Sequence, residues 1–199
     1  MNRRLVVATH NRDKFREIQE KLTALPLALL SLADFPLVGK VVEDQPTLYG
    51  NAIKKAMEVA EQVGEWVLSD DTGLEVDALN GAPGVLAARY SGPGATYESN
   101  WRKLLAEMRD VPDGQRLARF RTVACLRTGD GLYCVEGVLD GEIGREPRGT
   151  GGFGYDPVFV LPSGLTLAEL DLSAKNGISH RGKAIARIEV MLGFLLSQS

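Results

Sequence analysis

Apolar residues recur along the chain at two spacings, and these predict an alternation of strands and helices. Short apolar runs at 5–8, 27–32 and 66–68 are typical of buried strands. Apolar residues three or four positions apart predict helices over 15–25, 47–62, 97–109 and 184–195. Residues 74–79 alternate like a half-exposed strand, and 83–90 and 119–139 predict a short helical turn and a β-hairpin. This mixture indicates an α/β or α+β fold with a mixed sheet.

The composition is that of a globular protein, and we expect a single domain over residues 1–199. Hydrophobic residues make up 44% of the chain and charged residues 25%, both close to globular averages. The longest apolar stretch, 25–32, is too short to span a bilayer, and the start of the chain lacks a signal-peptide pattern. We therefore expect a cytoplasmic protein with no membrane partner. The net charge of −3 gives no basic field for nucleic acid, so an anionic ligand must be held by local charge.

The two cysteines, Cys125 and Cys134, flank a predicted two-residue hairpin loop at 129–130. They would then face each other across the hairpin, and a disulfide is geometrically possible. A cytosolic compartment favours reduced thiols that act as small hydrophobic residues.

Two adjacent carboxylates, Asp70 and Asp71, follow the apolar run at 66–68 and precede Gly73. Functional residues often collect where a strand gives way to a loop. Successive strand side chains point to opposite faces, so we expect one carboxylate to be catalytic or metal-binding and the other structural. An ordinary turn has the same residue types.

The segment 9–14 lies between the first predicted strand and the first predicted helix. Backbone N–H groups and the helix dipole favour an anion there, and Lys14 adds a positive charge. This segment is a candidate phosphate site, and the alternative is a capped helix with a solvated first turn.

An acidic segment that contains Glu43 and Asp44 precedes the helix that carries Lys55. Mg²⁺ prefers a few carboxylates, water and phosphate oxygens, so one of these two acids together with Asp71 would suffice for a magnesium site. An acidic surface loop is the alternative.

The C-terminal third holds two further unusual segments. Residues 145–157 contain four glycines, which permit close approach of a ligand, and the interleaved Phe153 and Tyr155 offer flat faces on which a base could stack. A flexible connection is the alternative. Residues 173–183 place His180 and Arg181 between two lysines. His180 and Arg181 can donate hydrogen bonds to carbonyl oxygens, and Lys175 can reach a phosphate or a base edge. Ser179 could instead cap the last helix.

Together these segments resemble the inosine triphosphate pyrophosphatase family, also called dITP/XTP pyrophosphatases. The resemblance covers nearly the whole chain and rests on seven motifs in the same order. They are Thr9-x-Asn11-x-x-Lys14, Glu43 upstream of Asn51-Ala52 and Lys55-Ala56, Ser69-Asp70-Asp71-Thr72-Gly73-Leu74, Gly81-Ala82-Pro83-Gly84, Ala88-Arg89-Tyr90-Ser91-Gly92, Gly152-Phe153-Gly154-Tyr155-Asp156-Pro157 and Ser179-His180-Arg181-Gly182.

The resemblance implies Mg²⁺-dependent hydrolysis of a purine nucleoside triphosphate to the monophosphate and pyrophosphate. It also implies a homodimer with an α/β fold: a central mixed β-sheet flanked by helices, in two lobes with a cleft between them. By position, Asp71 resembles the general base, and Glu43 with Asp71 the metal ligands. The substrate-binding residues that it implies are Thr9, His10, Asn11, Arg12, Asp13, Lys14, Lys55, Thr72, Phe153, Gly154, Tyr155, Asp156, Lys175, His180 and Arg181.

Physical chemistry is consistent with this assignment. A triphosphate brings about four negative charges, which a divalent ion and several Lys and Arg side chains must neutralise before water can attack. Donors from His180 and Arg181 would favour a 6-keto purine over adenine. A regulatory nucleotide-binding module without turnover, and a pyrophosphatase for other nucleotides, are the competing hypotheses.

Overall fold

The computed structural model describes residues 3–198, and this part of the chain divides into two compact units. Unit 1 consists of the chain up to Asp71, of Thr122–Gly137 and of the chain from His180 onward. Unit 2 consists of Thr72–Arg121 and Val138–Ser179. Each unit has its own hydrophobic core.

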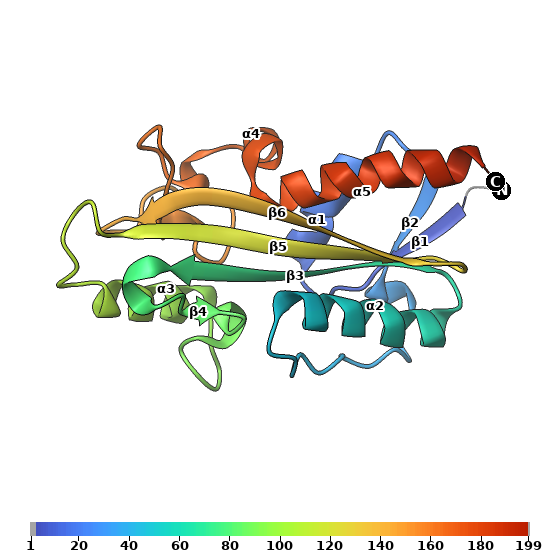
Figure 1. Ribbon diagram of the computed structural model, residues 1–199, viewed down its shortest axis with the longest axis horizontal. Coiled ribbons are helices and arrows are strands. Elements are labelled where there is room, and N and C mark those ends of the chain that lie inside the picture. Colours follow the sequence, from blue (N-terminus) through green and yellow to red (C-terminus); the bar gives the residue numbers. More distant parts are fainter. Residues whose placement is uncertain (1–2, 199) are drawn as a thin grey trace. The chain divides into compact units, whose positions relative to one another are not determined.

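The described strands form one mixed sheet (Figure 1). The strand order is β2-β1-β3-β5-β6-β7, and β4 pairs with β3. Strand β1 is parallel to β2 and β3, whereas β4 is antiparallel to β3 and β7 is antiparallel to β6. The strands are β1 (Arg3–Val7), β2 (Leu27–Ser31), β3 (Trp66–Val76), β4 (Pro83–Gly84), β5 (Leu117–Arg127), β6 (Leu132–Ile143) and β7 (Phe159–Val160). The predicted α/β class with a central mixed sheet is confirmed.

The longer helices begin and end at residues that suit those positions. Thr47 caps α2 by accepting a hydrogen bond from the backbone N–H of Gly50, and Gly64 ends the helix in the left-handed conformation that glycine adopts readily. No helix within residues 3–198 combines the length and apolar character needed to cross a membrane. The α-helices are α1 (Arg12–Leu22), α2 (Leu48–Val63), α3 (Tyr97–Glu107), α4 (Leu172–Ile178) and α5 (His180–Ser197).

In unit 1, helices cover both faces of the sheet (Figure 1). Leu5 and Leu68 point to the face covered by α1 and α5, where they pack against Ile18 and Ile185. The neighbouring residues Val6 and Val67 point to the opposite face, which α2 covers. Because the parts of β1 and β3 at 5–7 and 66–68 are covered on both faces, their sequences there are short apolar runs without alternation.

Unit 2 contains the C-terminal end of β3, the N-terminal end of β5 and the C-terminal end of β6. Leu104 of α3 and Met108, directly after this helix, belong to a core that contains Leu74 from β3. The rings of Phe120 on β5 and Phe159 on β7 lie 4.7 Å apart in the same core. This packing supports the segment 148–158, which carries the glycine-rich motif.

Several predicted elements differ from the structure. The strand that was expected to end at Asp70-Asp71 continues to Val76, so 66–68 and 74–76 belong to one strand. Pro83 and Gly84 pair with β3 instead of opening a helical turn, and the 3₁₀-helical turn begins at Ala87. Helix α4 and strand β7 were not predicted, and they are only seven and two residues long.

The prediction for the cysteines is wrong. Cys125 and Cys134 face each other across the β5–β6 hairpin with their Cα atoms 4.2 Å apart, and a disulfide joins them. The backbone N–H of Thr128 donates to the carbonyl of Gly131, which closes the expected two-residue loop. The predicted register was therefore right, and the compartment argument led to the wrong redox state.

Candidate active site

Asp70 and Asp71 lie next to each other in β3 and point to opposite faces of the sheet in unit 1. Asp70 points to the face of α1 and α5, where it meets Lys14 and Arg181. Asp71 points to the face of α2, where it meets Asn51 and Lys55. The strand therefore supplies one carboxylate to each of two buried networks.

The Asp71 network is held by one face of α2. Asn51 and Lys55 are four residues apart on this helix, so their side chains lie together. Asn51 Nδ2 donates to Asp71 Oδ2 at 3.0 Å, and Lys55 Nζ lies 3.6 Å from Asp71 Oδ1. Lys55 Nζ also donates to Glu43 Oε1 at 2.5 Å and to the backbone carbonyl of Asp70 at 2.6 Å. Two carboxylates, Glu43 and Asp71, thus converge on one ammonium group.

The neighbouring acid, Asp44, has a different environment. Its carboxylate accepts a hydrogen bond from Lys54 at 2.7 Å, and the Asp44 side chain is exposed to solvent. Of the two acids considered as a second metal ligand, Glu43 is therefore the one that faces the same lysine as Asp71.

Burial and charge shift the pKa values of this network in different directions. Burial raises the pKa of Asp71 above 3.8, and Lys55 and Lys14 offset that effect only in part. Burial would also raise the pKa of Glu43, but Lys55 outweighs it and holds that pKa below the ordinary value. A carboxylate with a raised pKa accepts a proton more readily, so Asp71 is the better general base of the two.

The Asp70 network is the more deeply buried of the two. Asp70 Oδ2 lies 3.0 Å from Lys14 Nζ and accepts a hydrogen bond from Arg181 Nε at 3.2 Å. Arg181 Nη1 also donates to Glu17 Oε2 at 2.5 Å. Burial opposes ionisation of Asp70, but Lys14 and Arg181 outweigh it and hold the pKa of this carboxyl well below its usual range. Asp70 thus remains ionised and fixes two cations in place.

The segment 9–14 contains the capped start of α1. It also places one charged side chain, that of Lys14, in the buried Asp70 network. Asn11 Oδ1 accepts hydrogen bonds from the backbone N–H groups of Asp13 and Lys14, and Thr9 Oγ1 accepts one from Asn11. The residues His10 and Arg12 are exposed. Lys14 reaches the buried carboxylate of Asp70, and burial lowers the pKa of Lys14 despite the attraction of Asp70.

A second cluster of predicted residues lies in unit 2. Lys175 Nζ is 2.5 Å from Asp156 Oδ2 and 4.5 Å from the centre of the Phe153 ring. The same carboxylate oxygen accepts a hydrogen bond from the backbone N–H of Phe153 at 2.7 Å. A Cβ atom at Gly152 would lie 2.1 Å from this oxygen, so only glycine fits beside it. The glycine-rich motif is therefore an ordered turn organised around Asp156.

The other predicted residues of unit 2 have different surroundings. The Tyr155 ring is part of the core, and its hydroxyl donates to the backbone carbonyl of Ala87 at 2.8 Å. Gly154 has a positive φ of 66° with open space at its Cβ position. Thr72 is the first residue of unit 2 and is half-buried in β3.

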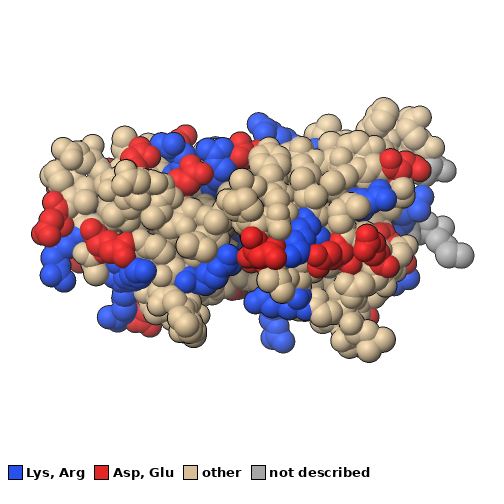
Figure 2. All heavy atoms as spheres, turned by 60° about the horizontal axis from the view of Figure 1, so that its bottom comes forward, with Lys and Arg blue, Asp and Glu red and all other residues tan. Residues whose placement is uncertain are grey.

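Lys14, Lys55, Asp71 and Arg181 are thus placed in connected buried networks, whereas sequence reasoning missed Glu17. This glutamate is only 3% exposed, on the apolar face of α1 next to Ile18. A charge at a buried helical position was the available signal, but its partner Arg181 lies 164 residues away in the sequence. Acidic and basic side chains alternate over the face shown in Figure 2, consistent with local rather than global charge.

Comparison with known proteins gives concordant results. The family model described as the Ham1 family matches residues 5–190. Proteins named dITP/XTP pyrophosphatase from Geobacter sulfurreducens and Desulforamulus reducens are 52% and 46% identical, and each alignment covers 96% of this chain and 97% or 96% of the relative.

Solved structures lead to the same family. A HAM1 protein from Coxiella burnetii superposes with a TM-score of 0.87 at 40% identity, and the Staphylococcus aureus Ham1 protein with 0.85 at 33% identity. Both comparisons cover 96% of this chain and 98% of the other. The resemblance deduced from the motifs is confirmed, and the chain belongs to the Ham1 family.

Proposed function

We propose that this chain hydrolyses the triphosphates of non-standard purine nucleosides, namely dITP, ITP and XTP, to the monophosphate and pyrophosphate. The relatives named dITP/XTP pyrophosphatase support this substrate class and make the chain a nucleoside-triphosphate pyrophosphatase, a hydrolase. The observation that carries the chemistry is the convergence of Glu43 and Asp71 on the Lys55 ammonium. Water activated there would attack the α-phosphorus.

The residues of unit 1 fit a magnesium ion. Glu43 and Asp71 both face the ammonium group of Lys55, and this supports a place for positive charge beside the two carboxylates. No group of three or more His, Cys, Asp or Glu side chains with metal-ligand geometry occurs among residues 3–198, but Mg²⁺ needs only one or two carboxylates besides water and phosphate oxygens. Bound Mg²⁺ would neutralise phosphate charge and lower the pKa of a coordinated water.

The charge balance of the two networks favours such a cation. Four carboxylates, Glu17, Glu43, Asp70 and Asp71, face three cations, Lys14, Lys55 and Arg181. When all are ionised, the networks carry one net negative charge, which cannot by itself hold a triphosphate. A divalent ion would reverse that sign, so we propose that Glu43 and Asp71 bind Mg²⁺ while Lys14 and Lys55 contact the phosphates.

Asp71 would act as the general base. Its pKa is raised by burial, and the hydrogen bond from Asn51 fixes one carboxylate oxygen. The other oxygen is then oriented toward the side of Lys55, where it can accept a proton from water. Asn51 is therefore a positioning residue that sequence reasoning placed only in a motif.

The roles of the residues that would recognise the base are predictions from the sequence. His180 and Arg181 are hydrogen-bond donors, so they would favour a 6-keto purine over the 6-amino group of adenine. Phe153, Asp156 and Lys175 are a stacking surface and an ion pair suited to the nucleoside end. We also propose that the protein is cytoplasmic, works as a homodimer and consists of a single catalytic domain.

A substrate panel tests the proposal. Purified protein is given ITP, dITP, XTP, GTP, ATP, dUTP and TTP at fixed Mg²⁺, and pyrophosphate and inorganic phosphate are measured separately. We expect pyrophosphate from the first three, and ¹⁸O from labelled water in the monophosphate. Release of inorganic phosphate would exclude cleavage at the α-phosphorus. Binding without turnover would support a regulatory module, and preference for dUTP or TTP would support another nucleotide class.

A further inference from the structure

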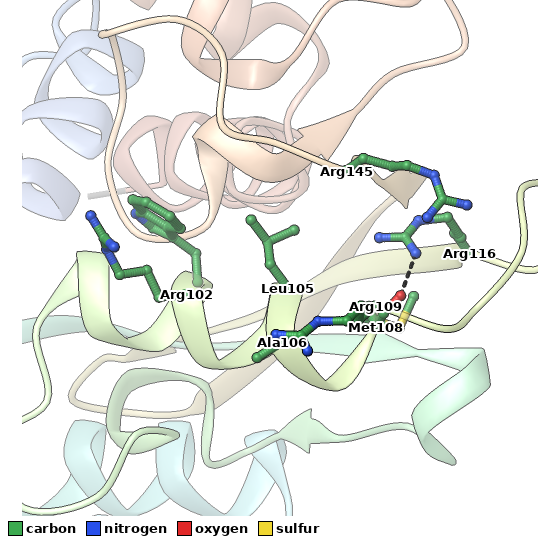
Figure 3. A pocket seen from close by; sticks show the side chains of 8 residues that line it. Arg102, Leu105, Ala106, Met108, Arg109, Arg116 and Arg145 are labelled. Atoms are coloured by element: carbon green, nitrogen blue, oxygen red, sulfur yellow. Dashed lines mark hydrogen bonds between the residues drawn. The ribbon is translucent and has the colours of Figure 1, made fainter.

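Unit 2 contains a pocket that shares no residue with the clusters described above. It has a volume of about 430 Å³ and lies along α3 and the segments around 116 and 145 (Figure 3). Four of its eight lining residues are arginines, and none is acidic. The lining residues are Trp101, Arg102, Leu105, Ala106, Met108, Arg109, Arg116 and Arg145.

Arg116 forms a fixed positive group at one end of the pocket. It is 3% exposed, and its guanidinium donates to the backbone carbonyls of Met108, Val111, Ile143 and Gly144 at 2.6–3.0 Å. These acceptors hold four of its five N–H groups, and all four are neutral. Among residues 3–198 Arg116 forms no ion pair with a carboxylate, and the longer-range attraction of Asp113 and Glu142 offsets its charge only in part.

Arg145 adds a second charge at the same end. It donates to the carbonyl of Val111, which also accepts from Arg116. Burial and then the charge of Arg145 lower the pKa of Arg116, which means that the two guanidinium groups repel each other. The only ion pair of Arg145 among the described residues is with Asp113, and that carboxylate is 84% exposed. An exposed pair of this kind is weak, so an anion could compete for Arg145.

The opposite end of the pocket is apolar, and its rim carries Arg109 and Arg102, of which Arg102 is in an exposed ion pair with Glu98. Trp101 and Leu105 line this end, and the Arg102 guanidinium lies 5.3 Å from the centre of the Trp101 ring. Arg109, one turn beyond Leu105, is exposed at the end of α3. Fixed guanidinium groups suit a phosphate, and an apolar aromatic wall suits a flat ring.

We propose that this pocket is a second ligand site, which binds a nucleoside monophosphate with the phosphate at Arg116 and Arg145 and the base against Trp101 and Leu105. The pocket volume is within the range that holds ligands of this size. The inference rests on unit 2 alone and does not depend on the proposed catalytic activity. Occupation would remove the repulsion between the two arginines.

Tryptophan fluorescence can report on this pocket directly. The chain has two tryptophans, and Trp66→Phe leaves Trp101 as the only one. This variant is titrated without Mg²⁺ with inosine monophosphate, ribose 5-phosphate and inorganic phosphate. We expect a saturable change with the nucleotide and much weaker responses to the other two, because they lack the flat ring.

Two substitutions with opposite expected effects on nucleotide affinity make the test specific. Arg145→Gln removes a charged donor and is expected to weaken nucleotide binding by at least about fivefold. Asp113→Asn releases Arg145 from its ion pair and is expected to strengthen binding. Arg4→Gln, an exposed arginine of unit 1, is the matched control and should change nothing.

The outcomes separate this site from the catalytic one. Arg145→Gln should leave pyrophosphate release from ITP unchanged, which shows that the variant is folded and that the catalytic networks are intact. No change in Trp101 fluorescence, a change that Arg145→Gln does not weaken, or equal binding of inorganic phosphate would overturn the proposal. Failure of ITP hydrolysis would overturn only the proposed function.

Discussion

Asp70 and Asp71 are consecutive residues of one strand, yet their carboxylates have opposite pKa shifts. The charges of Lys14 and Arg181 lower the pKa of Asp70 against the effect of burial, whereas burial prevails at Asp71 and raises its pKa. The alternation of side chains along β3 is the physical cause, since it directs the two groups to different helices. One residue is thereby suited to hold cations permanently and the other to exchange a proton.

Asp71→Asn tests the proposed role of Asp71 as the general base. The amide can still occupy the position of the carboxylate, but it cannot accept a proton from water. We expect kcat for pyrophosphate release from ITP to fall by at least about 10²-fold, with an unchanged circular dichroism spectrum. Asp77→Asn, a substitution of an exposed carboxylate directly after β3, is the control and should retain activity. A fully active Asp71→Asn enzyme would remove the general base from the mechanism.

Asp70→Asn tests the structural role of Asp70, and its effect on the free energy of unfolding depends on pH. A carboxyl whose pKa is depressed in the folded state contributes stability above its unfolded value of 3.8, and this contribution is lost as the pH falls from there through the folded pKa. The substitution leaves two buried cations without this partner, so we expect a loss of about 3 kcal/mol at neutral pH.

The measurement is the free energy of unfolding in urea as a function of pH. Below about pH 4 the wild-type protein should lose stability more steeply than Asp70→Asn, because only the wild type takes up this proton. Asp77→Asn again serves as the control, since its carboxylate is in an exposed ion pair. Parallel curves for wild type and Asp70→Asn would show that Asp70 does not stabilise the fold by its charge.

The sequence predicted much of unit 1 because its elements depend on local patterns. Thr47 and Gly64 mark the ends of α2, and the apolar run before Asp70 marks a buried strand. The continuation of β3 through Thr72 and Gly73 was missed, because these residues favour a turn locally, and the pairing of β3 within the sheet overrides that preference.

The networks were predictable only in part. Asp71, Lys14 and Lys55 stand in motifs, so their residue types indicated their importance. The division between Asp70 and Asp71 was expected from strand geometry, but the partners of each carboxylate come from distant segments. The contact between Glu17 and Arg181 required the packing of α1 against α5, which no local pattern contains.

The disulfide between Cys125 and Cys134 makes stability dependent on reductant. The cross-link restricts a short loop in the unfolded chain, and this effect is worth about 2–3 kcal/mol. We therefore expect the urea midpoint to fall when dithiothreitol is added. The double variant Cys125→Ala/Cys134→Ala is the control, and its midpoint should not respond to dithiothreitol. Two titratable thiols in the denatured wild-type protein without reductant would contradict the disulfide.

Gly152 and Gly154 provide a matched pair for testing the turn around Asp156. Both have φ of 66°, so alanine is strained by about 1–2 kcal/mol at either position. Only at Gly152 would the new Cβ lie 2.1 Å from Asp156 Oδ2, which also binds Lys175 and the backbone of Phe153. We expect Gly154→Ala to lower the free energy of unfolding in urea by the backbone strain alone, and Gly152→Ala to lower it by clearly more. If Asp156 and Lys175 hold the nucleoside, Gly152→Ala should also raise KM for ITP, whereas equal effects of the two substitutions would show that the carboxylate moves aside without consequence.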